Sequence, residues 1–62
     1  MNEPWKILFV DDDQDFLAAQ AAYFGSRGHL VHTAGSTEEA LHYLEDEAPD
    51  IIFLDLMMER YD

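Results

Sequence analysis

The sequence predicts a small α/β domain with a doubly wound parallel sheet, because short apolar runs alternate along it with helical segments. Residues 7–10 ("ILFV") and 51–54 ("IIFL") are continuous apolar runs, as is typical of strands covered on both faces. Residues 29–34 ("HLVHTA") are more polar and indicate an edge strand. The resulting order β-α-β-α-β favours a parallel sheet with right-handed crossovers.

The first helix is expected between residues 13 and 28. Asp13 is a suitable N-cap, and Gly28 is a suitable C-terminal stop. Several alanines within the segment support helix formation. The buried face is expected to be an apolar stripe at i, i+3 and i+7, with two more apolar residues beside it: Phe16, Ala19 and Tyr23, then Leu17 and Phe24.

The second helix is marked by a capping box, in which Ser36 stands three residues before Glu39. We expect Pro49 to end this helix, because proline cannot continue a helical hydrogen-bond pattern. The expected buried stripe consists of four apolar residues: Ala40, Leu41, Leu44 and Ala48.

The three strands are expected in the spatial order 2-1-3, with the first helix on one face of the sheet and the second helix on the other. The first and third strands are then neighbours, and the connections that leave them diverge to opposite faces. Open α/β sheets bind ligands in the crevice formed at such a point, beyond the carboxyl ends of the strands.

Composition limits the partners of the chain. Fourteen acidic residues and three basic residues among 62 give a formal charge of −11, which argues against direct binding to nucleic acid or to an anionic membrane surface. No apolar run approaches the roughly 20 residues of a membrane span, and the N-terminus has no signal-peptide pattern. There is no cysteine, so a cytoplasmic location is expected and any metal must bind to oxygen or imidazole.

Acidic residues follow both of the apolar strands. Asp11 and Asp12 come directly after residues 7–10, and Asp55 comes directly after residues 51–54. These carboxylates are expected to meet in the crevice, where they would repel one another unless a divalent cation lies between them. Oxygen ligands without His or Cys suit Mg²⁺, which uses only one or two carboxylates. Asp55 is then the better candidate for a nucleophile that attacks phosphorus to form an acyl phosphate.

Three segments at these spacings, "ILFVDDD", "HTAGSTEEAL" and "PDIIFLDLMM", together resemble the receiver domain of two-component response regulators. The resemblance implies a CheY-like, flavodoxin-like fold and a Mg²⁺ cofactor. It implies that Asp55 accepts a phosphoryl group from a histidine kinase or a phosphotransfer protein. Asp11 and Asp12 would bind the ion, together with Asp55 and the backbone carbonyl of Met57. Such a module is a switch and not an enzyme, apart from slow self-dephosphorylation.

Residues 1–62 match only the first half of the receiver fold. The Ser or Thr after the fourth strand and the Lys after the fifth strand of that family have no counterpart here, so switching by this chain alone is expected to be impaired. Glu59 also stands where the family often has proline. The outer edge of the third strand would be unpaired, which predicts either a homodimer formed through that edge or a fragment of a longer protein.

Two other functions stay open at the sequence level. Asp11 and Asp13 form a D-x-D pattern after a strand, which is similar to haloacid-dehalogenase-type phosphohydrolases with Asp11 as nucleophile and Asp13 as general acid. That interpretation leaves Asp55 unexplained. Alternatively, the chain is an inert, self-associating fragment. A calcium-binding loop is excluded, because Phe16 and Ala22 occupy the positions of the required Gly and Glu.

Overall fold

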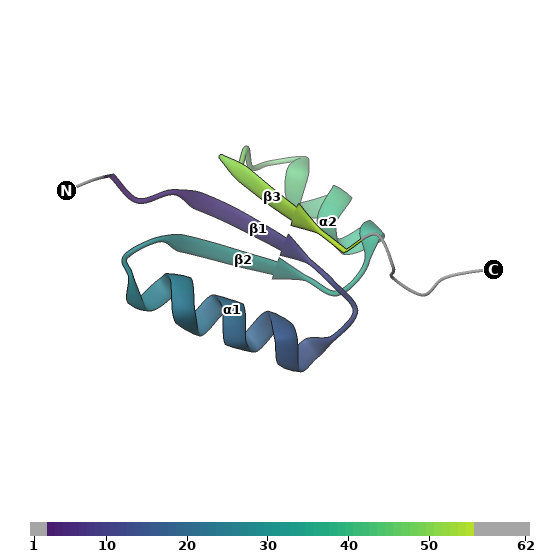
Figure 1. Ribbon diagram of the computed structural model, residues 1–62. Helices are drawn as coiled ribbons and strands as arrows, with labels where there is room; N and C mark the ends of the chain where they lie inside the picture. The colour runs from purple at the N-terminus through teal and green to yellow at the C-terminus, as the bar shows by residue number, and fades with distance from the viewer. Residues whose placement is uncertain (1–2, 56–62) are drawn as a thin grey trace.

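The computed structural model describes residues 3–55, which form a three-stranded parallel sheet between two helices (Figure 1). The elements follow one another as β1 (Lys6–Val10), α1 (Gln14–Ser26), β2 (Leu30–Ala34), α2 (Thr37–Leu44) and β3 (Ile51–Leu54). The strands lie side by side in the order β2-β1-β3. The predicted α/β class and strand order are confirmed. Neither helix of residues 3–55 is long and apolar enough to cross a lipid bilayer.

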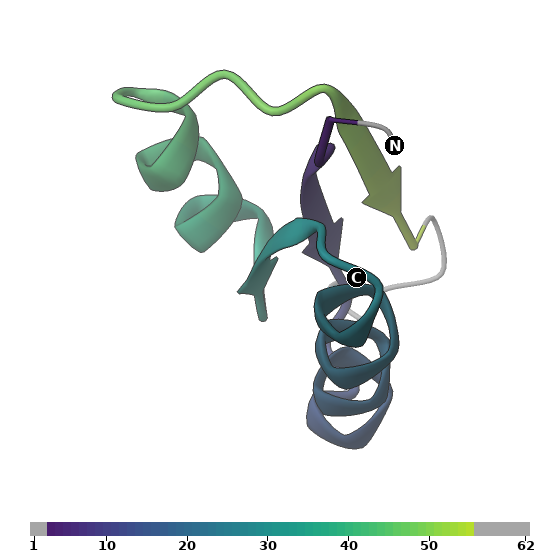
Figure 2. The same cartoon turned by 90° about the vertical axis from the view of Figure 1, so that its left-hand side faces the viewer.

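Strand β1 is the centre of the fold, and its two faces supply two separate cores. Four of its residues are at most 3% exposed: Ile7, Leu8, Phe9 and Val10. On one face Leu8 and Val10 pack with Ala34 and Ala40, on the side of α2. On the other face Ile7 and Phe9 pack with Leu17 of α1. Figure 2 shows the two helices on opposite sides of the sheet, as the sequence predicts.

Helix α1 begins and ends as predicted, but it buries a different face. Asp13 is the N-cap, and Gly28 adopts a φ of +93°, which a residue with a side chain rarely adopts. Leu17 is buried and Phe24 packs beside it, whereas Tyr23 is 51% exposed. The predicted stripe through Phe16, Ala19 and Tyr23 is therefore wrong by about one position. The helix has apolar residues on more than one side, so periodicity alone did not select the buried side.

Helix α2 is shorter than predicted. It ends at Leu44, five residues before Pro49, in a turn where backbone N–H groups bond to carbonyls three residues earlier. Ser36 is the N-cap and its hydroxyl accepts from the Glu39 N–H at 3.1 Å, as expected. The Glu39 carboxylate, however, accepts from the Gly35 N–H at 2.6 Å.

The buried side of α2 also differs from the predicted stripe. Ala40 is buried and Leu44 is half-buried, but Leu41 is 60% exposed and Ala48 is exposed beyond the end of the helix. Tyr43 takes part in their place, because its ring stacks on His32 of β2 with the ring centroids 4.0 Å apart. An aromatic pair across the sheet and helix thus sets the rotation of this two-turn helix.

Strand β3 lacks the cover on both faces that its sequence predicts. Ile51 packs against the core on the α1 side, but the next three residues are about half exposed within the described chain: Ile52, Phe53 and Leu54. The Phe53 ring stacks on Phe9 of β1, with the centroids 4.8 Å apart. Pairing with β1 is therefore the main interaction that holds β3 in place.

A pair of hydrogen bonds fastens the beginning of β3 to the beginning of β1. The Lys6 N–H donates to the Asp50 carboxylate at 2.8 Å, and the Asp50 N–H donates to the Lys6 carbonyl at 2.7 Å. The Lys6 ammonium also donates to the Glu47 carboxylate at 3.0 Å, and this contact raises the pKa of Lys6. Lys6 lies at the opposite end of β1 from Asp11.

Removal of the Asp50 side chain should weaken the attachment of β3. Asp50→Ala leaves the Lys6 N–H without its acceptor, so we expect a loss of about 1 kcal/mol. In a domain of this size that loss lowers Tm by about 4–8 °C in thermal unfolding followed by circular dichroism. Asp46→Ala, which changes the charge equally near the end of α2, is the control. Equal melting temperatures for the two variants would contradict this role of Asp50.

Candidate metal centre

The register of the sheet brings two acidic residues level with each other. Val10 pairs with Ala34 on one side and with Leu54 on the other. The backbone ladder continues one residue further, because the Asp11 N–H donates to the Ala34 carbonyl and the Asp55 N–H donates to the Val10 carbonyl, both at 3.1 Å. Asp11 and Asp55 therefore occupy equivalent positions just beyond adjacent strands.

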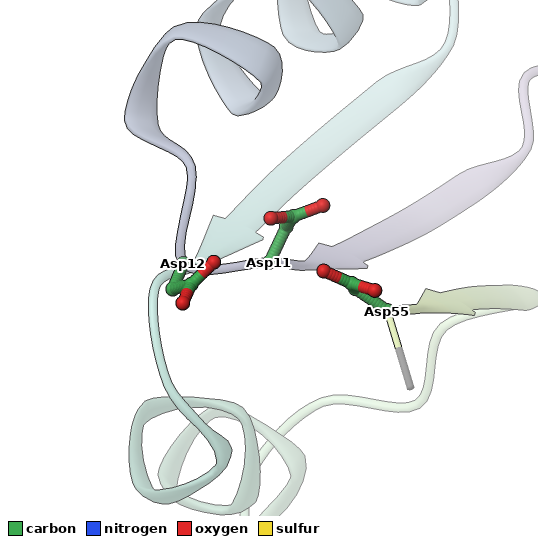
Figure 3. A group of neighbouring side chains, drawn as sticks. All are labelled: Asp11, Asp12 and Asp55. Carbon is green, nitrogen blue, oxygen red and sulfur yellow. The ribbon is translucent and has the colours of Figure 1, made fainter. Parts of the chain in front are cut away.

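Three carboxylates converge at this edge of the sheet. Asp11, Asp12 and Asp55 each offer an oxygen, and these oxygens all lie within 4.8 Å of one another. Figure 3 shows the three side chains directed into the same space, from the turn after β1 and from the end of β3. Asp11 and Asp55 are half-buried, and Asp12 is exposed. The structure thus brings together the three side chains that are expected from the sequence to meet, whereas Met57 and Glu59 lie outside the described residues.

The turn between β1 and α1 fixes the direction of Asp11. The Asp13 N–H donates to Oδ1 of Asp11 at 2.9 Å. Oδ1 of Asp13 in turn accepts from the N–H groups of Asp15 and Phe16, at 3.0 and 3.1 Å. The sequence indicates the helix cap, and the contact with Asp11 is a local Asx turn, a pattern that aspartate favours. Because Oδ1 of Asp13 caps the helix, its position does not support the general-acid role that a phosphohydrolase of the dehalogenase type would require.

The carboxylates in this cluster repel one another. Two unit charges about 4 Å apart repel by about 1 kcal/mol in water and by about 4 kcal/mol at the effective dielectric constant near a protein surface. An octahedral Mg²⁺ binds oxygens at about 2.0–2.1 Å, so neighbouring ligand oxygens are about 3 Å apart and opposite ones about 4.2 Å apart. The three acid oxygens lie within 4.8 Å of one another, so they would move closer together, or bind in part through water, to share one ion. Carboxylate oxygens are the ligands that Mg²⁺ prefers, and in this respect the donor set fits Mg²⁺.

An apolar hollow adjoins the carboxylates. It has a volume of about 320 Å³ and is lined by aromatic and aliphatic side chains together with two of the acids: Phe9, Val10, Phe16, Phe53 and Leu54, with Asp11 and Asp55. A larger hollow of about 700 Å³ lies between β2 and α2, beside the His32–Tyr43 pair, and contains none of the three acids. The site is thus open to water on one side and flanked by apolar surface on another.

Comparison with protein-family models finds a match to the response regulator receiver domain over residues 7–62. The chain belongs to the receiver domain family. This receiver chain is 40% identical over 57 residues to the alkaline phosphatase synthesis transcriptional regulatory protein PhoP of Bacillus subtilis, a match that covers 92% of the chain. It is 37% identical over 57 residues to the probable transcriptional regulator ycf27 of Guillardia theta, again over 92% of the chain.

A third relative, the transcriptional regulatory protein AfsQ1 of Streptomyces coelicolor, is 36% identical over 56 residues, or 90% of the receiver chain. The matches cover only 22–25% of these three relatives, so the receiver chain spans about a quarter of their length. No solved structure matches it significantly. The resemblance noted in the sequence is therefore confirmed at the level of the family.

The cluster of acids predicts a stabilising effect of Mg²⁺. At a Mg²⁺ concentration 100 times the dissociation constant, the receiver chain should gain about 2.7 kcal/mol relative to NaCl of equal ionic strength. Asp11→Asn should melt higher than the wild type without Mg²⁺, because one repelling charge is removed while the acceptor for the Asp13 N–H is kept. It should also lose most of the gain from Mg²⁺.

Thermal melts in both salts measure these effects, and Asp46→Asn is the control with the same change of charge. A full Mg²⁺ response in the Asp11→Asn variant would show that the ion acts elsewhere on the protein.

Proposed function

We propose that this chain is the phosphoacceptor module of a two-component signal transduction system and takes a phosphoryl group onto Asp55. One observation carries the proposal: Asp55 stands at the tip of β3, within 4.8 Å of two carboxylates from the turn after β1. Membership in the receiver family supports the same role. The donor would be a phosphohistidine of a histidine kinase or of a phosphotransfer protein.

Asp11 and Asp12 would hold Mg²⁺ together with Asp55, and the Met57 carbonyl, outside the described residues, would complete the set. When bound, Mg²⁺ neutralises negative charge on the transferred phosphoryl oxygens. Asp11 is suited to a fixed position, because a backbone N–H holds its Oδ1. Asp12 is exposed and can reach an ion that still carries water.

In the proposed transfer, a carboxylate oxygen of Asp55 attacks phosphorus while the bond from phosphorus to the donor nitrogen breaks. The electron pair of that bond stays on the leaving imidazole, and Asp55 becomes an acyl phosphate. The hydrogen bond from the Asp55 N–H to the Val10 carbonyl holds the backbone of the nucleophile in line with the sheet. The apolar hollow beside Asp55 would pack against one side of the donor imidazole ring and exclude part of the water there.

The module would act as a switch, with only slow hydrolysis of its own acyl phosphate. We propose that residues 1–62 correspond to the first half of the receiver fold, which is supported by their β-α-β-α-β order with three parallel strands. A cytoplasmic location and the absence of direct contact with nucleic acid belong to the same proposal, and the formal charge of −11 supports the second point.

Phosphorylation on Asp55 can be tested with acetyl phosphate as a small donor. In the presence of Mg²⁺, mass spectrometry should find one added phosphoryl group, and peptide mapping should place it on Asp55. Asp55→Asn should abolish the modification, and Asp46→Asn should leave it unchanged. Modification of Asp11 would contradict the proposal and would support the phosphohydrolase alternative.

We also propose that two copies can pair through the exposed edge of β3. Within residues 3–55, β3 pairs only with β1, and three of its side chains are about half exposed. An apolar edge strand of this kind favours pairing with another chain. Sedimentation velocity over a range of concentrations should therefore detect a dimer, and Ile52→Lys should reduce it. A monomer at every concentration would refute this association.

A further inference from the structure

We propose that Asp13 is a positioning residue for the metal centre. By capping α1, its side chain fixes the backbone N–H that orients the Asp11 carboxylate. The inference rests on the proposed function, because it assumes that Asp11 binds the ion. It assigns to Asp13 a task that needs neither direct contact with the metal nor the negative charge of its side chain.

Both the side chain and the backbone carbonyl of Asp13 accept hydrogen bonds from α1. Oδ1 of its side chain accepts from the N–H groups of Asp15 and Phe16, at 3.0 and 3.1 Å. Its carbonyl accepts from the Leu17 N–H at 3.1 Å. Leu17 is 3% exposed and packs in the core formed by the α1 side of β1. Asp13 is therefore connected to the sheet through one of the most deeply buried residues of the described chain.

The backbone N–H of Asp13 points in the other direction, toward Asp11. It donates to Oδ1 of Asp11 at 2.9 Å, a good length for a hydrogen bond to a carboxylate. A carboxylate has about four acceptor sites on its two oxygens, so one such bond leaves capacity for a cation. The bond restricts rotation of the Asp11 side chain before the ion arrives, and a side chain ordered in advance loses less entropy on binding. Partners that orient metal ligands typically raise affinity by about 10- to 100-fold.

Charge provides a competing explanation, because a carboxylate near a cation attracts it even without orienting a ligand. The two explanations differ for Asp13→Asn. Asparagine is as good an N-cap as aspartate, so it keeps the turn and removes the charge. Asp13→Ala removes both the cap and the charge. The positioning role therefore predicts that Asn rescues metal affinity, whereas a role through charge predicts that Asn and Ala are equally weak.

The experiment measures the Mg²⁺ dissociation constant of the full chain by isothermal titration calorimetry, for the wild type and three variants. Asp13→Ala should raise the dissociation constant by about tenfold. Asp13→Asn should raise it by no more than about fivefold, the effect expected for an exposed charge. Ser36→Ala removes the N-cap of α2, which has no hydrogen bond to Asp11 among residues 3–55, and should leave the constant near the wild-type value.

A second measurement follows the hydrogen bond itself. In ¹⁵N–¹H spectra recorded without Mg²⁺, the amide proton of residue 13 should exchange with solvent faster in Asp13→Ala than in Asp13→Asn. If Asp13→Ala does not fold, Asp13→Gly replaces it, because glycine at an N-cap loses less stability. The change in amide exchange does not depend on metal binding.

The outcomes separate the two proposals. Weak binding by Asp13→Ala, rescue by Asp13→Asn and no change in Ser36→Ala support the positioning role. Equal constants for Asp13→Ala and the wild type, or equal losses in Ala and Asn, overturn it while the metal site itself stands. A similar loss in Ser36→Ala also overturns it, since general destabilisation would then be the cause. A wild-type chain that binds no Mg²⁺ overturns the proposed function and this inference together.

Discussion

The parallel pairing of β3 with β1 is the interaction on which the candidate site depends. Strand β1 is buried on both faces, but β3 has little helical cover in the described structure. Its register relies on the ladder with β1, on the stacked rings of Phe9 and Phe53, and on the hydrogen bonds between Lys6 and Asp50. A slip of one residue would turn the side chain of Asp55 to the other face of the sheet and away from Asp11.

The same edge of the sheet combines half-buried and exposed acids. Asp11 and Asp55 are half-buried and continue the backbone ladder, so their positions follow from the sheet. Asp12 is exposed and lies in the turn. Holding three like charges together lowers the stability of the fold. A bound cation would attract the three carboxylates, so the same cluster would then raise the stability of the fold. A small domain with two modest cores is sensitive to such a change, so occupancy of the site and stability of the fold should be closely linked.

Much of this arrangement could be predicted from the sequence, because its strongest signals are local. The apolar runs at 7–10 and 51–54 gave the strands, and Asp13 and Ser36 gave the helix starts. Together with the expected strand order 2-1-3, the chain connectivity then places Asp11 and Asp55 at neighbouring strand ends. The sides of the two helices that are buried were harder to predict from the sequence. The stripe on α1 was misplaced because Tyr23 remains at the surface, where its ring lies under the guanidinium of Arg27. Leu41 was misassigned because packing of Tyr43 on His32 rotates α2. The contact of Tyr43 with His32 forms between two elements and has no signal within either segment, whereas the contact of Tyr23 with Arg27 lies within the first helical segment.

The central claim is that acids from two distant segments share one cation, and paramagnetic broadening by Mn²⁺ tests it most directly. Mn²⁺ prefers the same oxygen ligands as Mg²⁺. In ¹⁵N–¹H spectra with a small fraction of Mn²⁺, the amides of residues 11, 12 and 55 should broaden first and together. Those of residues 6 and 51, at the opposite end of the strands, should broaden last, and excess Mg²⁺ should restore the signals. Broadening of residues 11 and 12 without residue 55, or broadening centred on another acidic region such as residues 45–47, would contradict the account.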